Sequence, residues 1–109
     1  MPEPSAVPSI ISRYFDRAVD PDLETYYALF TPDATVEDDG HLHEGIEAIR
    51  AWRTSVPNVT YTITDVEPVG DMMRVVAAVA GDFPGSPVSL SFDFVAYDEH
   101  FISELRIHT

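Results

Sequence analysis

The pattern of hydrophobic and polar residues divides the chain into a helical part followed by a part made of strands. Apolar residues recur every three or four positions near the N-terminus, again from residue 23, and again from residue 46. This is the spacing of amphipathic helices. From residue 59 onward apolar and polar residues alternate in runs bounded by Gly, Pro and Asp, which is typical of strands. The pattern therefore predicts an α+β fold in which helices cover one face of an antiparallel sheet.

Three helices are expected from these apolar stripes. The first ends near Ala18, and the Asp-Pro-Asp stretch at residues 20–22 stops it and starts the second. We expect the second helix to extend to Phe30, because Pro32 prevents it from continuing. The third follows Gly45 and carries Trp52 on its apolar side.

Between the second and third helices, residues 34–39 form a predicted short strand, and residues 41–44 a second strand or arm. The long strands are expected at residues 59–69, 72–83, 88–97 and 101–108. In the 88–97 strand Leu90, Phe92 and Phe94 share one face, while Ser91, Asp93 and Val95 are on the other. Because both faces carry apolar residues, we expect helices on one and a second copy of the chain on the Phe92 face. The prediction is a homodimer through the outer sheet face.

Composition limits the classes of partner. The 109 residues predict one domain spanning residues 1–109, with a loose tail at residues 1–5. The net charge is −13 and the chain has six Arg and no Lys, so it cannot build the basic surface that nucleic acid requires. No apolar run is long enough for a membrane span and the N-terminus lacks a basic, signal-like region. A cytoplasmic location is expected.

The residue types present also exclude several chemistries. Without Cys there is no thiolate nucleophile or zinc-thiolate site, and without Lys there is no Schiff base. His41 and His43 lie on one side of an extended segment, but a metal site needs a further ligand. Local hydrogen bonding is the favoured interpretation for His43. No metal and no cofactor are expected.

Two acids and one tyrosine are the candidates for chemistry. Asp38 follows Val36 by two positions, so its carboxylate is expected on an apolar strand face; the alternative is a solvated acid at a strand end. Tyr14 lies on the apolar stripe of the first helix, where it is either a pocket residue or a core residue. Asp93 either faces the same pocket or pairs with an arginine, Arg74 or Arg106, across strands.

Four segments carry a resemblance to a known superfamily: RYF at residues 13–15, DATVED at 33–38, HEG through IRAW at 43–52, and DFVAYDEH at 93–100. On these segments the chain is identified as a member of the nuclear transport factor 2-like superfamily, which includes SnoaL-like polyketide cyclases and ketosteroid isomerases. It most resembles the isomerases. The resemblance implies a cone-shaped α+β barrel, with three N-terminal helices packed on a strongly curved, mostly antiparallel sheet around a deep apolar pocket.

The resemblance also implies roles for the candidates. Asp38 matches the general base, while Tyr14 and Asp93 match the two donors to the substrate oxygen. Moving a proton next to a carbonyl needs both functions. Phe30 and Arg53 stand where the bacterial isomerases have tyrosines that support the donor. The implied pocket wall consists of Phe15, Tyr26, Phe30, Val36, Trp52, Arg53, Ser91 and Val95.

The expected ligand is a small hydrophobic carbonyl compound, steroid-like or polyketide-like. Allylic isomerisation of the ketosteroid isomerase kind is the leading hypothesis. An aldol ring closure of the SnoaL-like cyclase kind is the nearest alternative, because it uses the same base. A non-catalytic module for ligand binding or dimerisation is the third, because the same fold can serve different functions.

Overall fold

The computed structural model describes residues 9–56, 59–97 and 101–108. Within them the elements are, in order, α1 (Ser9–Ala18), α2 (Leu23–Tyr27), β1 (Phe30–Asp38), β2 (His41–Glu44), α3 (Ile46–Thr54), β3 (Val59–Val69), β4 (Met72–Gly81), β5 (Val88–Tyr97) and β6 (Phe101–His108). The expected loose tail at residues 1–5 lies outside the described residues. The predicted α+β class, with three helices and a sheet, is confirmed.

The strands form one six-stranded sheet in the order β2-β1-β6-β5-β4-β3. The β1–β6 pair is parallel and the other four pairs are antiparallel. The expectation of a mostly antiparallel sheet is therefore confirmed. A closed barrel is not formed, because β2 and β3 are the two edges of the sheet. The three helices are also not one N-terminal block, since β1 and β2 precede α3.

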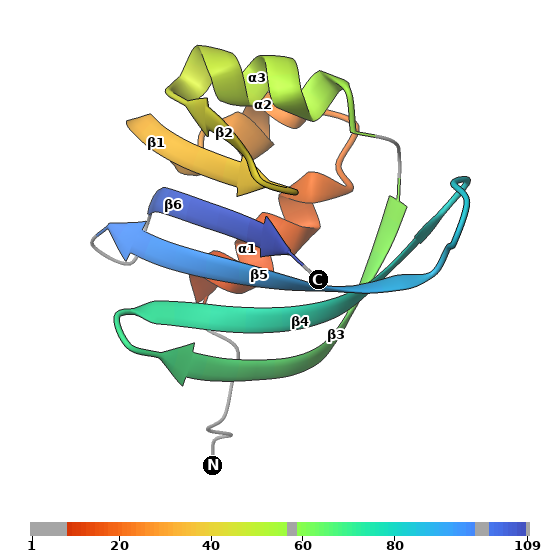
Figure 1. The fold of residues 1–109 in the computed structure, drawn as a ribbon. Helices are drawn as coiled ribbons and strands as arrows, with labels where there is room; N and C mark the ends of the chain where they lie inside the picture. The colour runs from red at the N-terminus through yellow and green to blue at the C-terminus, as the bar shows by residue number, and fades with distance from the viewer. Residues whose placement is uncertain (1–8, 57–58, 98–100, 109) are drawn as a thin grey trace.

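The helices lie on the concave side of the sheet. In Figure 1 the long strands β3, β4 and β5 bend around α1, and α3 runs alongside β1 and β2. Val75 of β4, Phe92 of β5 and Leu105 of β6 are buried on this side. The ring of Tyr14 in α1 packs on Phe94, with 5.1 Å between ring centroids. The core is thus filled by aromatic side chains between α1 and the middle of the sheet.

The face assignment of β5 is corrected by these contacts. Phe92 and Phe94 point toward α1 and not outward. Alternation divides a strand into two sets of side chains but does not say which set meets the helices. Here the large aromatic set fills the core, and Ser91, Asp93 and Val95 face the other way. The apolar outer face on which dimerisation was predicted is therefore absent from β5.

The second helix is shorter than expected. It ends at Tyr27, and Phe30 begins β1, where it pairs with Ile102 of β6. The Ile102 N–H also donates to the Leu29 carbonyl at 2.7 Å, so sheet pairing replaces the last helical turn. Pro32 lies in the irregular part of the β1–β6 pairing between Phe30 and Thr35, where a residue without an N–H is tolerated.

The long strands follow the sequence pattern more closely. β3, β5 and β6 have the expected bounds, while β4 ends at Gly81 and not at Phe83. Phe83 therefore lies in the connection between β4 and β5. This connection brings an aromatic side chain to the end of the sheet, next to the cavity described below.

Candidate active site

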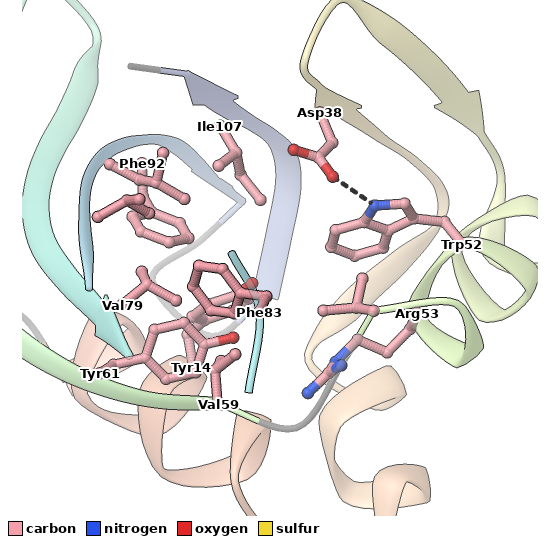
Figure 2. Close-up of a pocket in the computed structure, with 13 residues that line it drawn as sticks. Tyr14, Asp38, Trp52, Arg53, Val59, Tyr61, Val79, Phe83, Phe92 and Ile107 are labelled. Atoms are coloured by element: carbon pink, nitrogen blue, oxygen red, sulfur yellow. Dashed lines mark hydrogen bonds between the residues drawn. The ribbon is translucent and has the colours of Figure 1, made fainter. Parts of the chain in front are cut away.

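A cavity of about 200 Å³ opens between α1, α3 and the concave face of the sheet (Figure 2). Its lining is mostly aliphatic and aromatic, and consists of Tyr14, Asp38, Trp52, Arg53, Val56, Val59, Tyr61, Val79, Phe83, Val88, Leu90, Phe92 and Ile107. Pockets for drug-sized ligands measure roughly 300–1,000 Å³. This cavity therefore suits a smaller molecule, of about one or two rings, better than a complete steroid.

Asp38 is the only carboxylate among the described residues of this lining. It is the last residue of β1 and is paired in register with Ile107 of β6, which lines the cavity beside it. The Nε1–H of Trp52 in α3 donates to Asp38 Oδ2 at 3.0 Å, as Figure 2 shows. This hydrogen bond fixes one carboxylate oxygen and leaves the other without a protein donor in the described residues. The result is an oriented acceptor at the wall of an apolar cavity.

Tyr14 and Tyr26 form a buried hydroxyl pair. Their oxygens lie 3.1 Å apart, and either can donate. Burial raises the pKa of Tyr14 well above its usual value, and Tyr26 adds to the increase. Burial likewise raises the pKa of Tyr26. Both phenols therefore stay protonated, and when Tyr26 donates to Tyr14 the Tyr14 proton is available to a ligand.

This pair changes the expectation about Phe30 and Arg53. The resemblance implied that these residues replace supporting tyrosines of the isomerases, so the sequence predicted a donor tyrosine without support. Tyr26, from α2, supplies a hydroxyl partner to Tyr14 instead. The sequence offered Tyr26 only as a pocket wall residue. In the structure it lies behind Tyr14 and is fully buried.

Arg53 is a buried cation at the edge of the cavity, with 6% of its surface exposed. Its Nη2 donates to the carbonyl of Ala18, the last residue of α1, at 2.7 Å. The guanidinium carbon lies 5.2 Å from the ring centroid of Tyr26. Burial raises the pKa of Tyr61, and the charge of Arg53 partly offsets this. Arg53 thus lies on the tyrosine side of the cavity.

Asp93 does not lie in the cavity, so the expectation that it stands beside Tyr14 is wrong. Its carboxylate accepts from Arg74 Nε at 2.8 Å and Nη2 at 3.2 Å, and lies 2.9 Å from His108 Nε2. Burial alone would raise the pKa of Asp93, but the bonds to Arg74 and His108 outweigh it and lower the pKa. Asp93 is therefore an ionised acceptor on the opposite sheet face. The alternative of pairing with Arg74 is the one observed.

The remaining predicted wall residues divide into three groups. Trp52 and Arg53 lie in the lining. Ser91 and Val95 do not, because they share the outward face of β5 with Asp93. The others are buried in the core behind the lining and do not border the cavity: Phe15, Tyr26, Phe30 and Val36.

Sequence reasoning missed most of the wall that the strands supply. Tyr61, Leu90, Phe92 and Ile107 line the cavity, and none was proposed as a pocket residue. The alternation in residues 90–94 was visible, but it was assigned the wrong face toward the helices, and residues 59–63 were assigned no face. Phe83 was missed for a different reason, since it was expected inside a strand.

Metal-binding residues do not gather in the described part of the chain: it contains no group of three or more His, Asp or Glu side chains placed to hold an ion. His43 instead packs its ring on Trp52, with 5.9 Å between ring centroids. None of the helices in residues 9–56, 59–97 and 101–108 is long and apolar enough to cross a membrane.

Comparisons with known proteins agree with this architecture. The sequence profile of the SnoaL-like domain matches residues 11–103. A proposed polyketide cyclase from Sinorhizobium meliloti is 35% identical, with a TM-score of 0.85 over 94% of this chain and 95% of that one. No curated protein gives a significant match.

Two more distant structures share the fold. A protein from Catenulispora acidiphila with a ketosteroid isomerase-like fold, solved in complex with trimethylamine, is 21% identical, with a TM-score of 0.79 over 95% of this chain and 87% of that one. A proposed ketosteroid isomerase from Kribbella flavida is 16% identical, with a TM-score of 0.77 over 92% of this chain and 74% of that one.

Proposed function

The chain belongs to the SnoaL-like domain family of the nuclear transport factor 2-like superfamily, and we propose that it is an enzyme that moves a proton at carbon in a small hydrophobic carbonyl compound. One observation carries this proposal. Asp38 is an oriented carboxylate in the wall of a mostly apolar cavity that a buried phenol, Tyr14, also borders. An acceptor for a proton and a donor for an oxygen are the two parts that enolisation needs.

In the proposed step Asp38 takes a proton from the carbon next to the substrate carbonyl. The electron pair of that C–H bond moves into the carbonyl group and makes an enolate. Tyr14 donates a hydrogen bond to the enolate oxygen, and Tyr26 donates to Tyr14 in turn. The proton held by Asp38 returns to the product at a later step, so the enzyme ends in its starting state.

The enolate has two possible fates, and we favour attack on a second carbonyl of the same molecule. This forms a carbon–carbon bond and closes a ring, while the new alkoxide takes up a proton. The 35% identity to a proposed polyketide cyclase supports this fate. Isomerisation is the second candidate. It is supported by the relatives with isomerase-like folds, but the second acid donor expected for it, Asp93, is paired elsewhere.

The direct test is exchange of the acidic C–H protons of β-tetralone in D₂O, followed by proton NMR. This two-ring ketone fits a cavity of about 200 Å³ and needs no knowledge of the natural substrate. We expect the protein to accelerate exchange and Asp38→Asn to remove the acceleration. Asp39→Asn is the matched control, because Asp39 is the exposed neighbour at the strand end and asparagine tolerates its positive φ of 53°.

Other outcomes separate the alternatives. Conversion of a β,γ-unsaturated ketone to its conjugated isomer, seen as rising ultraviolet absorbance, would favour isomerisation. Closure of a linear diketone without such conversion would favour the cyclase reaction. Equal exchange with the wild type and Asp38→Asn would overturn the proposed base. No exchange, with phenol binding that depends on Tyr14, would point to a non-catalytic binding module.

A further inference from the structure

Arg53 is a buried cation for which the described residues provide no carboxylate partner. Ion pairs in these residues involve Arg50, Arg74, Arg106 and His108, but not Arg53. Its one hydrogen bond goes to the neutral carbonyl of Ala18. A charged side chain with only 6% of its surface exposed is normally paired, because removing it from water without a counter-charge is unfavourable.

Arg53 has N–H groups for which the described residues provide no acceptor. A guanidinium has several N–H donors in a planar fork, and the Ala18 carbonyl takes one nitrogen. Among the described residues, the only enclosed side-chain nitrogen or oxygen without a partner is Thr31 Oγ1. The remaining Arg53 nitrogens are therefore not sealed inside the protein. Because Arg53 lines the cavity, these nitrogens are the groups of this residue that a ligand there would use.

Arg53 also connects the cavity to a second hollow. This neighbour has a volume of about 480 Å³, is bounded by the end of α1 and the start of α2, and shares Arg53, Val56 and Val59 with the cavity wall. Figure 2 shows Arg53 toward the tyrosine end of the lining and Asp38 with Trp52 at the other end. A ligand group bound by Arg53 would therefore lie away from the base.

We propose that Arg53 binds a carboxylate of the substrate, so that the substrate is a small hydrophobic carbonyl compound that also carries a carboxylate. This inference rests on the proposed function for the reacting part of the molecule. Planar guanidinium groups bind carboxylates through paired hydrogen bonds. The contact with Ala18 caps the C-terminal end of α1, but that role uses one nitrogen and needs no cavity beside it.

The charge of the whole protein makes this proposal easy to test. A net charge of −13 disfavours any anion near the chain. A preference of the cavity for an anion over its neutral analogue must then come from local groups, and Arg53→Gln shows whether the guanidinium is the one responsible. Among the described residues that line the cavity, Arg53 is the only cation.

The experiment is calorimetric titration with naphthoate and with the uncharged naphthamide, which have the same ring system. At neutral pH we expect the wild type to bind naphthoate about ten- to a hundredfold more tightly, as one charge-assisted interaction would give. Arg53→Gln should remove the preference and keep the affinity for naphthamide. Arg50→Gln is the control, because Arg50 is an exposed arginine on the same helix, paired with Glu24.

Naphthamide binding also reports whether the variant is folded. If Arg53→Gln binds neither probe, Arg53→Lys keeps the charge and is expected to retain part of the preference. The inference is overturned if the wild type binds neither probe or shows no preference for naphthoate, or if the preference persists in Arg53→Gln.

Tetralone exchange is measured separately. If tetralone protons exchange in an Asp38-dependent way but the protein does not prefer naphthoate to naphthamide, only the inference about Arg53 is wrong. If the protein prefers naphthoate but does not catalyse exchange, only the proposed function is wrong.

Discussion

Asp38 and Asp93 are both acids on strands of one sheet, yet the two faces of the sheet give them different surroundings. On the concave face a neutral indole N–H orients Asp38 beside apolar side chains. On the other face Asp93, with 4% of its surface exposed, is held by the guanidinium of Arg74 and the imidazole of His108. The first acid keeps an oxygen available to a ligand. The second has its hydrogen-bonding capacity taken by protein groups.

This difference teaches how to judge a buried acid. Burial alone raises the pKa of a carboxyl and favours a neutral donor, but hydrogen bonds from a guanidinium and an imidazole can reverse the direction. For Asp93 the hydrogen bonds to Arg74 and His108 lower the pKa, which predicts that its carboxylate stabilises the sheet. The two sites can be separated experimentally, because a change at Asp38 should affect chemistry and a change at Asp93 should affect unfolding.

The largest effect is expected at Asp38. Replacement by asparagine keeps the size of the side chain and removes the proton acceptor, so catalysed exchange of tetralone protons should fall by about 10²–10⁴-fold. The measurement is the exchange rate by NMR, with the thermal midpoint as the control for folding. A fall of less than threefold would show that another group is the base.

Removal of the Tyr14 hydroxyl is expected to have the next largest effect. Tyr14→Phe should lower the exchange rate by about a hundredfold, the usual cost of one donor to a developing oxyanion. Tyr26→Phe should lower it less, by about tenfold, because Tyr26 acts through Tyr14. Steady-state exchange kinetics of both variants provide the test. A larger loss in Tyr26→Phe than in Tyr14→Phe would contradict this order.

On the outer face, Asp93→Asn should lower the free energy of unfolding by about 1–3 kcal/mol, because it weakens charge-assisted bonds to a buried carboxylate. Its exchange activity should be unchanged. Asp65→Asn, at an exposed position on β3, should change stability by less than about 0.5 kcal/mol. Urea unfolding of the three proteins makes the comparison. Equal stability of the two variants would show that the Asp93 cluster does not stabilise the fold.

The orientation of Asp38 by Trp52 should have a smaller effect. Trp52→Phe keeps an aromatic ring in the wall and removes the N–H that donates to Oδ2. We expect kcat to fall by about tenfold with little change in KM, since an orienting bond affects the reacting geometry more than ligand binding. A change confined to KM would indicate that Trp52 only shapes the wall.

The pH dependence of stability should also distinguish the two acids. The folded-state pKa of Asp93 is lowered, so its contribution is present above the pKa of the unfolded chain, roughly pH 4. It is lost as the pH falls through the folded value. The difference in unfolding free energy between the wild type and Asp93→Asn should therefore hold at pH 5 and shrink toward pH 3. A difference that grows on acidification would contradict the assigned charge state.

The strands were the most predictable part of the fold. β3, β5 and β6 have the bounds expected from alternation and turn residues, because those signals are local. The end of α2 was not predictable, since Phe30 continues the helical spacing and only its pairing with Ile102 of a distant strand places it in β1. Long-range pairing overrides local pattern at that position.

The candidate site divides in the same way. Asp38, Tyr14, Trp52 and Arg53 were proposed from the sequence and lie in the cavity lining, although their roles remain predictions. The predicted assignment of the two faces of β5 was wrong, because packing against Tyr14 decides which face meets the helices and alternation does not.

The oligomeric state is also still a prediction. The outer face of β5 carries the Asp93 cluster and not the aromatic side chains on which the homodimer was based. Sedimentation equilibrium of the wild type and of Asp93→Asn would show whether copies of the chain associate and whether this face takes part.

The central claim is that the acid on the concave face does the chemistry. It is tested most directly by β-tetralone exchange in D₂O, measured in parallel for the wild type, Asp38→Asn and Asp93→Asn at one pH and protein concentration. We predict that Asp38→Asn exchanges no faster than buffer and that Asp93→Asn matches the wild type. Exchange that survives in Asp38→Asn and is lost in a folded Asp93→Asn would contradict the assignment of the two acids.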